Sequence, residues 1–475
     1  MRRAKCCSSS DRQARRRRPA RAGTASYSGL VHPSLSEPLT RLPDGTVKQR
    51  NPFTGTEVWT VPGRGHRPLG LVRPAPQPLD PAQHGRHCAF CEHRMLETPP
   101  EKSRIVSTRA DDGAPAWQIL RHPAAERLGE TTPAFRRVPN LFEILSYDYW
   151  RANYGYALTT AARRHRDDYL ASEAGRAHVR AVVETKLRAA GRSPDEIDAM
   201  SEDETIDAAS GFFGGGHDVI IARRHYVDGA ADDHRLASAG TLTLDEHHAF
   251  IAFTAEAARA LYEANRDVRY VSVFQNWLKP AGASFDHLHK QLVAIDERGA
   301  QNEAVLARLR ADPNVFNEDA VNYAARHSLV IAENEHAVMF AGFGHRYPTL
   351  EVYSKSAESD PWAQAPEELR GMSDLLHAAH AATGADVPCN EEWHTRPADV
   401  EAGMPWRVCL KWRVSTLAGF EGATKINVNA VSPYGVRDRV VDRLFSLRAE
   451  GTVAPDMLIA AEAPCRPNML RYARR

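Results

Sequence analysis

One segment, residues 269–296, limits the fold of this chain more than any other. It reads RYVSVFQN, then WLKPAGAS, then FDHLHKQLVAID. A run rich in β-branched and aromatic residues leads into a connection with Pro280 and Gly282, and a second strand-like run follows, which is typical of a β-hairpin. The segment therefore predicts two adjacent antiparallel strands, and with them an antiparallel sheet.

Histidine and glutamine alternate in the second of these runs. On a strand, side chains two residues apart share a face, so His287, His289 and Gln291 are expected on one surface. A neutral imidazole can act as a nucleophile at pH 7, and a glutamine amide can donate to a phosphoryl oxygen. Asn276 and Ser284 lie just upstream and add neutral donors suited to a bound phosphate. The chain has 21 histidines, so the pattern alone also allows a structural role.

The rest of the chain mixes sheet and helix. Residues 48–224 carry short strand-like pieces, interrupted between 147 and 211 by an alanine-rich and charged block with helical spacing. Thr243 and Glu246 form a capping-box pattern at the start of an amphipathic helix. Further strands are expected within 327–343 and 412–420, and further helices over 367–380 and 436–447. The fold class predicted is α+β, built on antiparallel strands with packed helices.

Composition excludes several classes of protein. The 61 Lys and Arg residues against 60 Asp and Glu residues leave a formal charge of +1, so no overall charge favours nucleic acid or a membrane surface. Seven scattered cysteines do not resemble a secreted disulfide framework, and no apolar run is long enough to span a bilayer. We therefore expect a cytoplasmic protein without a membrane or nucleic-acid partner. Residues 1–29 are arginine-rich and are expected to form a disordered basic tail.

A second motif, HCAFCEH, contains the CxxC pair Cys88 and Cys91. In a reducing compartment such a pair is typical of half a zinc site, because tetrahedral zinc prefers cysteine and histidine. A redox pair is the alternative, although the proline-rich surroundings differ from a thioredoxin-like setting. The sequence contains no second CxxC, so the remaining ligands would be histidines, with the candidates His87, His93, His225 and His287.

Many short motifs, in order, resemble the galactose-1-phosphate uridylyltransferase family, the branch of the histidine-triad superfamily that includes ADP-glucose phosphorylases. They include RNPFTGTEVWTVPGRGHRP, CAFCEHRMLETPPE, VPNLFEIL, GGGHDVIIARRH, NWLKPAGASFDHLHKQ and LAGFEGATKINVNAVSP. Ordered agreement of several motifs is more specific than any one of them. The resemblance covers the chain from about Lys48 to the last predicted helix.

The resemblance implies a fold and an activity. The fold is two related antiparallel half-barrels with packed helices, here divided into residues 30–300, with the helical insertion 147–211, and residues 301–475. The activity is transfer of a nucleoside monophosphate, by default UMP, between a nucleotide sugar and a hexose 1-phosphate through a covalent histidine adduct. Alternatives are a phosphorylase or hydrolase of the same superfamily, or a non-catalytic zinc-stabilised nucleotide-binding protein. A homodimer is also left open.

Roles carry over to the positions that match the family motifs. The resemblance implies that His289 is the nucleophile and that one structural zinc is held by Cys88, Cys91, His225 and His287. It implies substrate contacts for Gln291, Ser284, Asn276, Asn140, Glu421, Arg50, Arg64 and Arg67, of which Glu421 would hold sugar hydroxyls. Two departures matter. Leu288 stands where the family has proline, and a second His-x-His aligns with Pro405, Trp406 and Arg407, leaving only His394 of that site. We therefore predict no second metal and leave the acceptor open.

Overall fold

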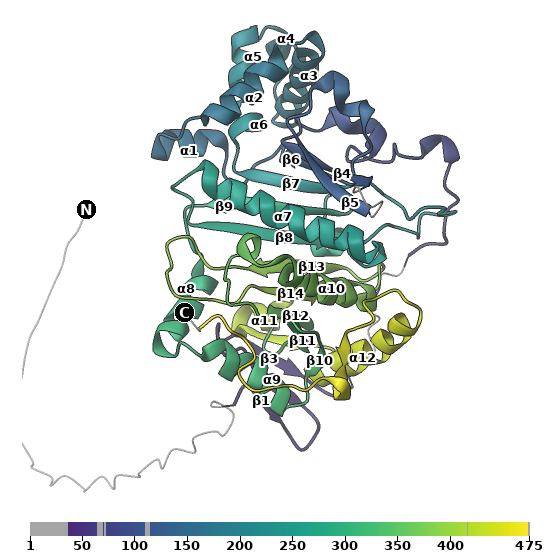
Figure 1. Cartoon of the computed structure of the whole chain (residues 1–475), viewed down its shortest axis with the longest axis vertical. Coiled ribbons are helices and arrows are strands. Elements are labelled where there is room, and N and C mark those ends of the chain that lie inside the picture. The colour runs from purple at the N-terminus through teal and green to yellow at the C-terminus, as the bar shows by residue number, and fades with distance from the viewer. Residues whose placement is uncertain (1–36, 64–69, 71–72, 110–114, 416, 474–475) are drawn as a thin grey trace, which may run out of the picture. The chain divides into compact units, whose positions relative to one another are not determined.

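Twelve antiparallel strands form one continuous sheet, which spans both halves of the sequence (Figure 1). The computed structural model describes residues 37–63, 70, 73–109, 115–415 and 417–473. In spatial order the strands are β16 (Leu458–Ile459), β10 (Val330–Glu333), β11 (Ala337–Ala341), β12 (Thr349–Ser354), β14 (Arg407–Trp412), β13 (Cys389–His394), β8 (Tyr270–Trp277), β9 (His289–Ile295), β7 (His217–Ala222), β6 (Phe135–Pro139), β4 (Ser103–Arg109) and β5 (Pro115–Arg121). The predicted α+β class with antiparallel strands is confirmed, whereas the half-barrel subdivision stays a prediction.

The hairpin expected at residues 269–296 is present as β8 and β9, which pair with Phe274 opposite Gln291. The second strand is shorter than predicted. It begins at His289, so His287 lies in the preceding connection rather than on the strand. Gly282 in that connection has a φ of +89°, a left-handed conformation that favours glycine and turns the chain toward β9.

Two long helices cover one face of the sheet. Helix α7 (Leu244–Ala264) begins at the predicted Thr243–Glu246 capping box, and α10 (Pro366–Thr383) includes the helix predicted over 367–380. Figure 1 shows both lying across the sheet, α7 over β8 and β9 and α10 over the second half. Their apolar side chains pack with the sheet in the main hydrophobic core.

The segment predicted to be a helical insertion contains six helices: α1 (Tyr147–Tyr154), α2 (Thr160–Leu170), α3 (Glu173–Ala189), α4 (Pro194–Asp198), α5 (Glu202–Ala208) and α6 (Ser210–Gly214). The second half adds α8 (Ala300–Ala311), α9 (Tyr323–Arg326), α11 (Gly419–Thr424) and α12 (Pro433–Ala449). The helix predicted over 436–447 is thus confirmed. The strand predicted over 412–420 is wrong, because β14 ends at Trp412 and the Glu421 carboxylate accepts from the Ala418 amide to cap α11.

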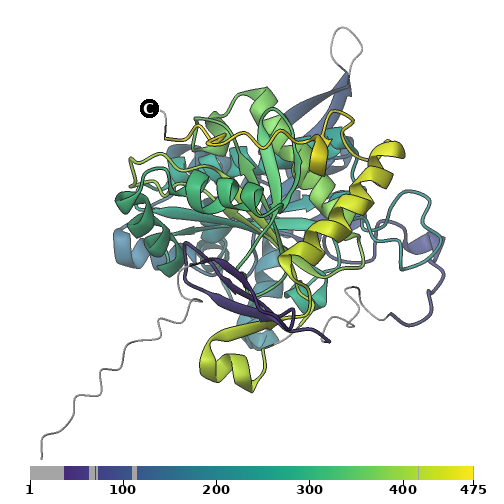
Figure 2. The same cartoon turned by 90° about the horizontal axis from the view of Figure 1, so that it is seen from below.

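A separate four-stranded sheet joins the two ends of the chain. It contains β1 (Leu39–Arg41), β2 (Val47–Arg50), β3 (Glu57–Thr60) and β15 (Ile426–Asn429), with β3 and β15 parallel. Figure 2 shows its strands beside α11. Residues Pro38–Arg475 form one compact unit, so the predicted boundary near residue 300 stays a prediction. The basic tail 1–29 lies outside the described residues. Within the described ranges, no helix has both the length and the apolarity needed to cross a bilayer.

A buried ion pair connects the two halves of the large sheet. The Lys290 ammonium on β9 lies 2.6 Å from a carboxylate oxygen of Glu391 on β13, and both side chains are fully buried. His380 and Trp393 also donate to Glu391. Burial alone would raise the pKa of Glu391, but the charge of Lys290 and the hydrogen bond from His380 outweigh it and hold that pKa well below its usual range.

Replacing Glu391 with glutamine should therefore destabilise the protein strongly. Glu391→Gln leaves the Lys290 charge buried without an anion, a change that costs about 3–5 kcal/mol in comparable buried pairs. Urea unfolding followed by circular dichroism measures the free energy of unfolding. Glu335→Gln is the matched control, because its side chain is 87% exposed. A loss no larger than that of the control would mean that water or another group compensates Lys290.

Candidate functional site

Two cysteines and two histidines from distant parts of the sequence meet at one point. The Cys88 and Cys91 sulfurs are 3.8 Å apart, and His225 Nδ1 lies 3.5 and 3.6 Å from them. His287 Nδ1 lies 3.5 Å from Cys88 Sγ and 3.8 Å from Cys91 Sγ. This group could hold a metal ion. Of the four candidate histidines, His225 and His287 therefore join the cysteines.

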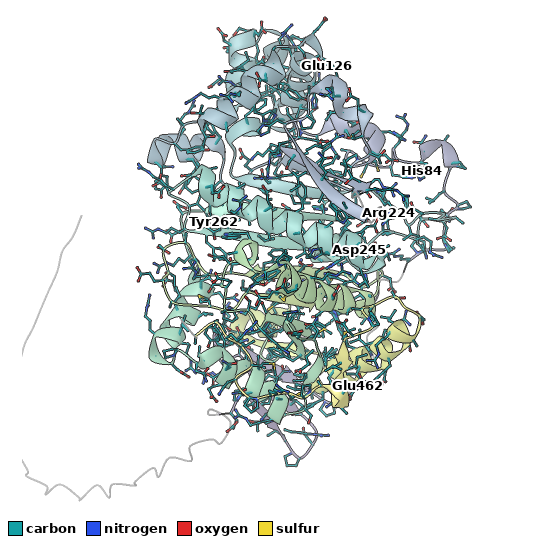
Figure 3. The ribbon with its side chains drawn as sticks, in the orientation of Figure 1. His84, Glu126, Arg224, Asp245, Tyr262 and Glu462 are labelled. Carbon is teal, nitrogen blue, oxygen red and sulfur yellow. The ribbon has the colours of Figure 1, made fainter. Side chains whose placement is uncertain are left out.

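Neighbouring groups orient these donor atoms. His287 Nε2 donates to the Ala222 carbonyl at 2.6 Å, which leaves Nδ1 facing the sulfurs. Arg224 holds the segment that carries His225, because its guanidinium contacts Glu246 of α7 at 2.6 Å; Figure 3 labels Arg224 above the start of this helix. Hydrogen bonds with Cys88 and with the two imidazoles lower the pKa of Cys91 to about 2, which favours its thiolate. The hydrogen bond with Cys91 and burial raise the pKa of Cys88, so one thiolate is preformed, and a bound cation would find its donor atoms already aligned.

The CxxC loop also contacts the predicted nucleophile. Phe90 lies between the two cysteines in sequence, and its ring is 5.2 Å from that of His289 and 6.1 Å from that of His287. The Phe90 carbonyl accepts from the buried Arg136 guanidinium at 3.0 Å, which fixes the loop against β6. The cysteine–histidine group therefore sets the surface on which the His289 ring rests.

His289 is a buried, neutral imidazole with one nitrogen left for chemistry. Its Nδ1–H donates to the His287 carbonyl at 2.8 Å, so Nε2 carries the lone pair. Burial lowers the pKa of His289 to about 4, against the opposing effect of that carbonyl. The side chain is 5% exposed. At neutral pH the ring is thus an unprotonated base whose reactive nitrogen is oriented by the backbone.

Gln291 is held by a residue that the sequence reasoning missed. His217 on β7 accepts from the Ile144 amide through Nδ1, so its Nε2–H donates to Gln291 Oε1 at 3.0 Å. The Asn140 amide also lies 3.4 Å from Gln291 Oε1 and 3.0 Å from His217 Nε2. The Gln291 carbonyl is therefore occupied and its NH₂ group is available as a donor. The motif GGGHDVII contained the signal for His217, because it places a histidine on the strand next to β9.

The other two predicted phosphate-holding residues lie on the hairpin. Asn276, near the end of β8, accepts from Asn390 at 2.7 Å and lines a cavity of about 550 Å³ on the open face of the sheet. Phe274, which pairs with Gln291, lines the same cavity. Ser284 is exposed in the connection before β9. Asn276 and Ser284 thus flank the strand that carries His289 and Gln291.

The remaining predicted substrate residues lie elsewhere. Arg50 ends β2, in the four-stranded sheet. Glu421 lies on α11 beside that sheet, lines a cavity of about 300 Å³ with Trp59 and Phe420, and accepts from the Ala418 amide. Arg64 and Arg67 lie outside the described residues. Both residues thus belong to the four-stranded sheet and the helix beside it, whereas His289 begins β9 of the large sheet.

Known proteins resemble this chain in sequence and in fold. ADP-glucose phosphorylase from Arabidopsis thaliana is 28% identical over 181 residues, which cover 36% of this chain and 50% of the relative. The match thus spans about half the length of that curated protein. A crystal structure of an ADP-glucose phosphorylase from Arabidopsis thaliana with bound ADP-glucose has a TM-score of 0.53 at 18% identity, covering 84% of this chain and 98% of the other. A galt-like protein from Arabidopsis thaliana has a TM-score of 0.51 at 18% identity over 83% and 98%.

These likenesses confirm the resemblance inferred from the motifs and show a shared fold. The sequence profile described as domain of unknown function DUF4921 matches residues 42–472. That match includes both halves of the large sheet, three of the four strands of the smaller sheet (β2, β3 and β15) and the His289 region. The chain therefore belongs to the DUF4921 family, and its fold is that of ADP-glucose phosphorylase and the galt-like proteins.

Proposed function

We propose that the protein transfers a nucleoside monophosphate from a nucleoside diphosphate sugar, through a covalent adduct on His289. The observation that carries the proposal is the state of that residue: a buried neutral imidazole whose Nδ1 is bonded to a backbone carbonyl and whose Nε2 has no hydrogen-bond partner among the described residues. The amide of Gln291 lies two residues along the same strand and is held through its carbonyl oxygen. The nucleophile and a hydrogen-bond donor for the phosphoryl oxygens are therefore placed together on one strand.

The chemistry balances without a redox partner. Nε2 of His289 attacks the α-phosphorus, the bond from that phosphorus to the bridging oxygen breaks, and the sugar 1-phosphate leaves. In the second step an oxygen of an acceptor phosphate attacks the same phosphorus, and the nitrogen–phosphorus bond breaks to regenerate the imidazole. The amide of Gln291 would donate to the phosphoryl oxygens as charge develops on them.

The acceptor defines the reaction class. Inorganic phosphate would make the protein a phosphorylase that releases a nucleoside diphosphate, and a hexose 1-phosphate would make it a transferase. Partial identity to ADP-glucose phosphorylase supports the first, and the motifs around His289 resemble those of the family that includes both classes. The UMP transfer predicted from sequence is one form of the second. We carry both acceptors into the experiment, with Glu421 and Arg50 as proposed substrate contacts.

Zinc is the metal that fits the cysteine–histidine group. A tetrahedral zinc ion, about 2.3 Å from sulfur and about 2.0–2.1 Å from nitrogen, requires ligand separations of about 3.8 Å between sulfurs and about 3.5 Å between sulfur and nitrogen. The observed separations are 3.8 Å and 3.5–3.8 Å. All four ligands come from the protein, so the ion would serve as a structural crosslink.

The two halves of the large sheet are proposed to be related units. In the first half the order β6, β7, α7, β8, β9 places β9 between β8 and β7. In the second half the order β11, β12, α10, β13, β14 places β14 between β13 and β12. In each unit one long helix crosses the same face. This parallel supports the half-barrel relationship inferred from sequence.

Intact-mass spectrometry tests the proposed activity directly. The purified protein is mixed with UDP-glucose, ADP-glucose or GDP-glucose and quenched, and the mass increase identifies the nucleotide on the enzyme. Adding inorganic phosphate or a hexose 1-phosphate should then discharge the adduct and identify the acceptor. A phosphoramidate adduct should survive alkali and be lost in acid. Absence of any adduct with all three donors would contradict the proposal.

Replacing Gln291 should slow the reaction without abolishing it. Gln291→Ala removes one preorganised donor, and such losses reduce rates by about 10²–10³-fold. Rapid-quench mass spectrometry measures the rate of adduct formation. Gln118→Ala is the matched control, because Gln118 is exposed on the edge strand β5. Equal rates in the two variants would assign Gln291 a structural role beside His217.

A further inference from the structure

Arg407 is a buried cation that forms no ion pair among the described residues. It is the first residue of β14 and is 3% exposed. Its Nη1 has no hydrogen-bond partner, and its side chain forms no ion pair within the described part of the chain. Burying a charged group is costly unless it is paired, so buried guanidinium groups normally meet a carboxylate or phosphate. Glu351 is near enough for the Arg407 charge to lower its pKa, but no ion pair or hydrogen bond joins the two side chains, so the guanidinium edge is left for an anion from outside the chain.

Two aromatic rings fix the direction in which Arg407 can bind. Its guanidinium carbon lies 4.9 Å from the Phe316 ring centroid and 5.9 Å from that of Phe53. Rings stacked on a guanidinium occupy its faces and leave the N–H groups at its edges. Arg407 lines a cavity of about 360 Å³ on the open side of the sheet. The cavity is large enough for a phosphate group.

A second polar group in the same cavity also lacks a partner. His394 on β13 is opposite Arg407 in the strand pairing, is 8% exposed and lines the cavity. Its Nε2 has no hydrogen-bond partner among the described residues, and a carboxylate oxygen of Glu392 lies 3.9 Å from it. Burial, with the nearby positive groups Arg407 and Lys411, lowers the pKa of His394 well below its ordinary value. A neutral His394 would present an N–H or a lone pair beside the guanidinium.

Glu351, the acidic residue that lines the cavity, is already engaged, and so is the lining residue Lys411. Glu351 accepts from His345 at 2.8 Å and from the Tyr353 hydroxyl at 3.0 Å, whereas Lys411 pairs with Glu392 at 2.5 Å.

His345, Glu351 and Cys409 have the donor atoms of a cation site. The positive charge of Arg407, however, acts to lower the pKa of both Glu351 and Cys409. A cation bound there would lie near the positive charge of Arg407, which would repel it, so the cavity favours an anion.

We propose that this cavity is an anion subsite that binds a phosphate group between Arg407 and His394. A guanidinium edge can donate two parallel hydrogen bonds to phosphate oxygens, which is the geometry that arginine provides. The subsite lies apart from the nucleophile: β9 and β14 are three strand spacings apart, or about 15 Å. The phosphate bound here is thus a second group, either inorganic phosphate or the phosphate of a sugar phosphate or nucleotide.

The repeat of the two halves gives a second argument, which rests on the proposed function. Arg407 begins β14 as His289 begins β9, and each follows a strand that pairs with it in an antiparallel hairpin. In the proposed function, His289 at the start of β9 meets a phosphoryl group as a nucleophile. At the equivalent position in the second half, Arg407 provides a permanent positive charge. The second position would then bind phosphate without reacting with it.

Thermal unfolding with added anions tests the subsite. Phosphate, sulfate, glucose 1-phosphate and AMP are each added at constant ionic strength, balanced with chloride, to the wild type and to Arg407→Met. At ligand concentrations well above the dissociation constant, we expect the wild-type Tm to rise by about 2–4 °C with at least inorganic phosphate. Arg407→Met should weaken that binding by about 10- to 100-fold, the usual effect of removing a charged hydrogen bond. Arg259→Met, on the exposed surface of α7, should leave it unchanged.

The stability of the variants without ligand separates the subsite from a structural role for Arg407. The subsite predicts that Arg407→Met without ligand is as stable as the wild type or more stable, because an unpaired buried charge is removed, and that Arg407→Lys binds phosphate with intermediate affinity. Protection only by glucose 1-phosphate or AMP would identify an organic phosphate as the ligand. Equal phosphate protection in wild type and Arg407→Met, or no protection by any of the four anions, would overturn the subsite. So would zinc binding that is lost in Cys409→Ala. None of these readouts depends on the His289 adduct.

Discussion

His289→Ala should fold, keep its metal content and form no covalent nucleotide adduct. The imidazole Nε2 is the one nucleophile that the proposed mechanism uses, and the cysteine–histidine group does not include His289. Loss of a catalytic nucleophile reduces turnover by on the order of 10⁴-fold or more, so steady-state activity should fall to background. Intact mass after mixing with the best donor measures the adduct, and circular dichroism checks the fold. The residual binding of nucleotide should remain measurable by calorimetry.

His84→Ala is the matched control for this experiment. His84 is exposed on the chain near the CxxC loop (Figure 3), so its loss should change neither the adduct nor the metal content. An adduct of wild-type amount on His289→Ala would show that another residue is the nucleophile. Turnover at the wild-type rate without any adduct would favour direct transfer, and the alternating histidines would then be structural.

Local sequence signals predicted most elements correctly where one physical rule dominated. The capping box at Thr243 and Glu246 placed the start of α7, because both reciprocal hydrogen bonds form there. The Pro280 and Gly282 connection placed the β8–β9 hairpin. The 412–420 segment failed because its helix depends on Glu421 reaching back to the Ala418 amide, an interaction that strand propensity does not describe.

The site was predictable only in part, because its partners are distant in sequence. Spacing identified Cys88 and Cys91, but which two histidines complete the group depends on how β7 lies beside β9. The contact between His217 and Gln291 has the same origin. The lack of an ion pair at Arg407 on β14 could not be inferred from sequence. It depends on Glu351 of β12 and Glu392 of β13 bonding to other side chains.

Removing the cysteine pair should lower both metal content and stability. The double variant Cys88→Ser, Cys91→Ser loses both thiolates of the proposed zinc site, and binding energy at a structural zinc site is folding energy of about 10–16 kcal/mol in small domains. That range equals or exceeds the net stability of most proteins, about 5–15 kcal/mol. We therefore expect a loss of folded yield, and plasma mass spectrometry should find about one zinc per wild-type chain and none in the variant.

The cysteine variant and His289→Ala together separate the role of the metal from that of the nucleophile. Cys465→Ser is the control for the cysteine pair, because Cys465 lies outside the cysteine–histidine group. Since Phe90 of the CxxC loop packs on His289, zinc loss should also slow adduct formation, whereas His289→Ala should leave zinc in place. Zinc retained in the double variant would assign the metal to other ligands, and a Cys88–Cys91 disulfide in active, metal-free protein would favour the redox interpretation. Loss of the metal should therefore impair adduct formation, because the CxxC loop supports the His289 ring. Loss of His289 should not impair metal binding, because His289 is not one of the four metal ligands.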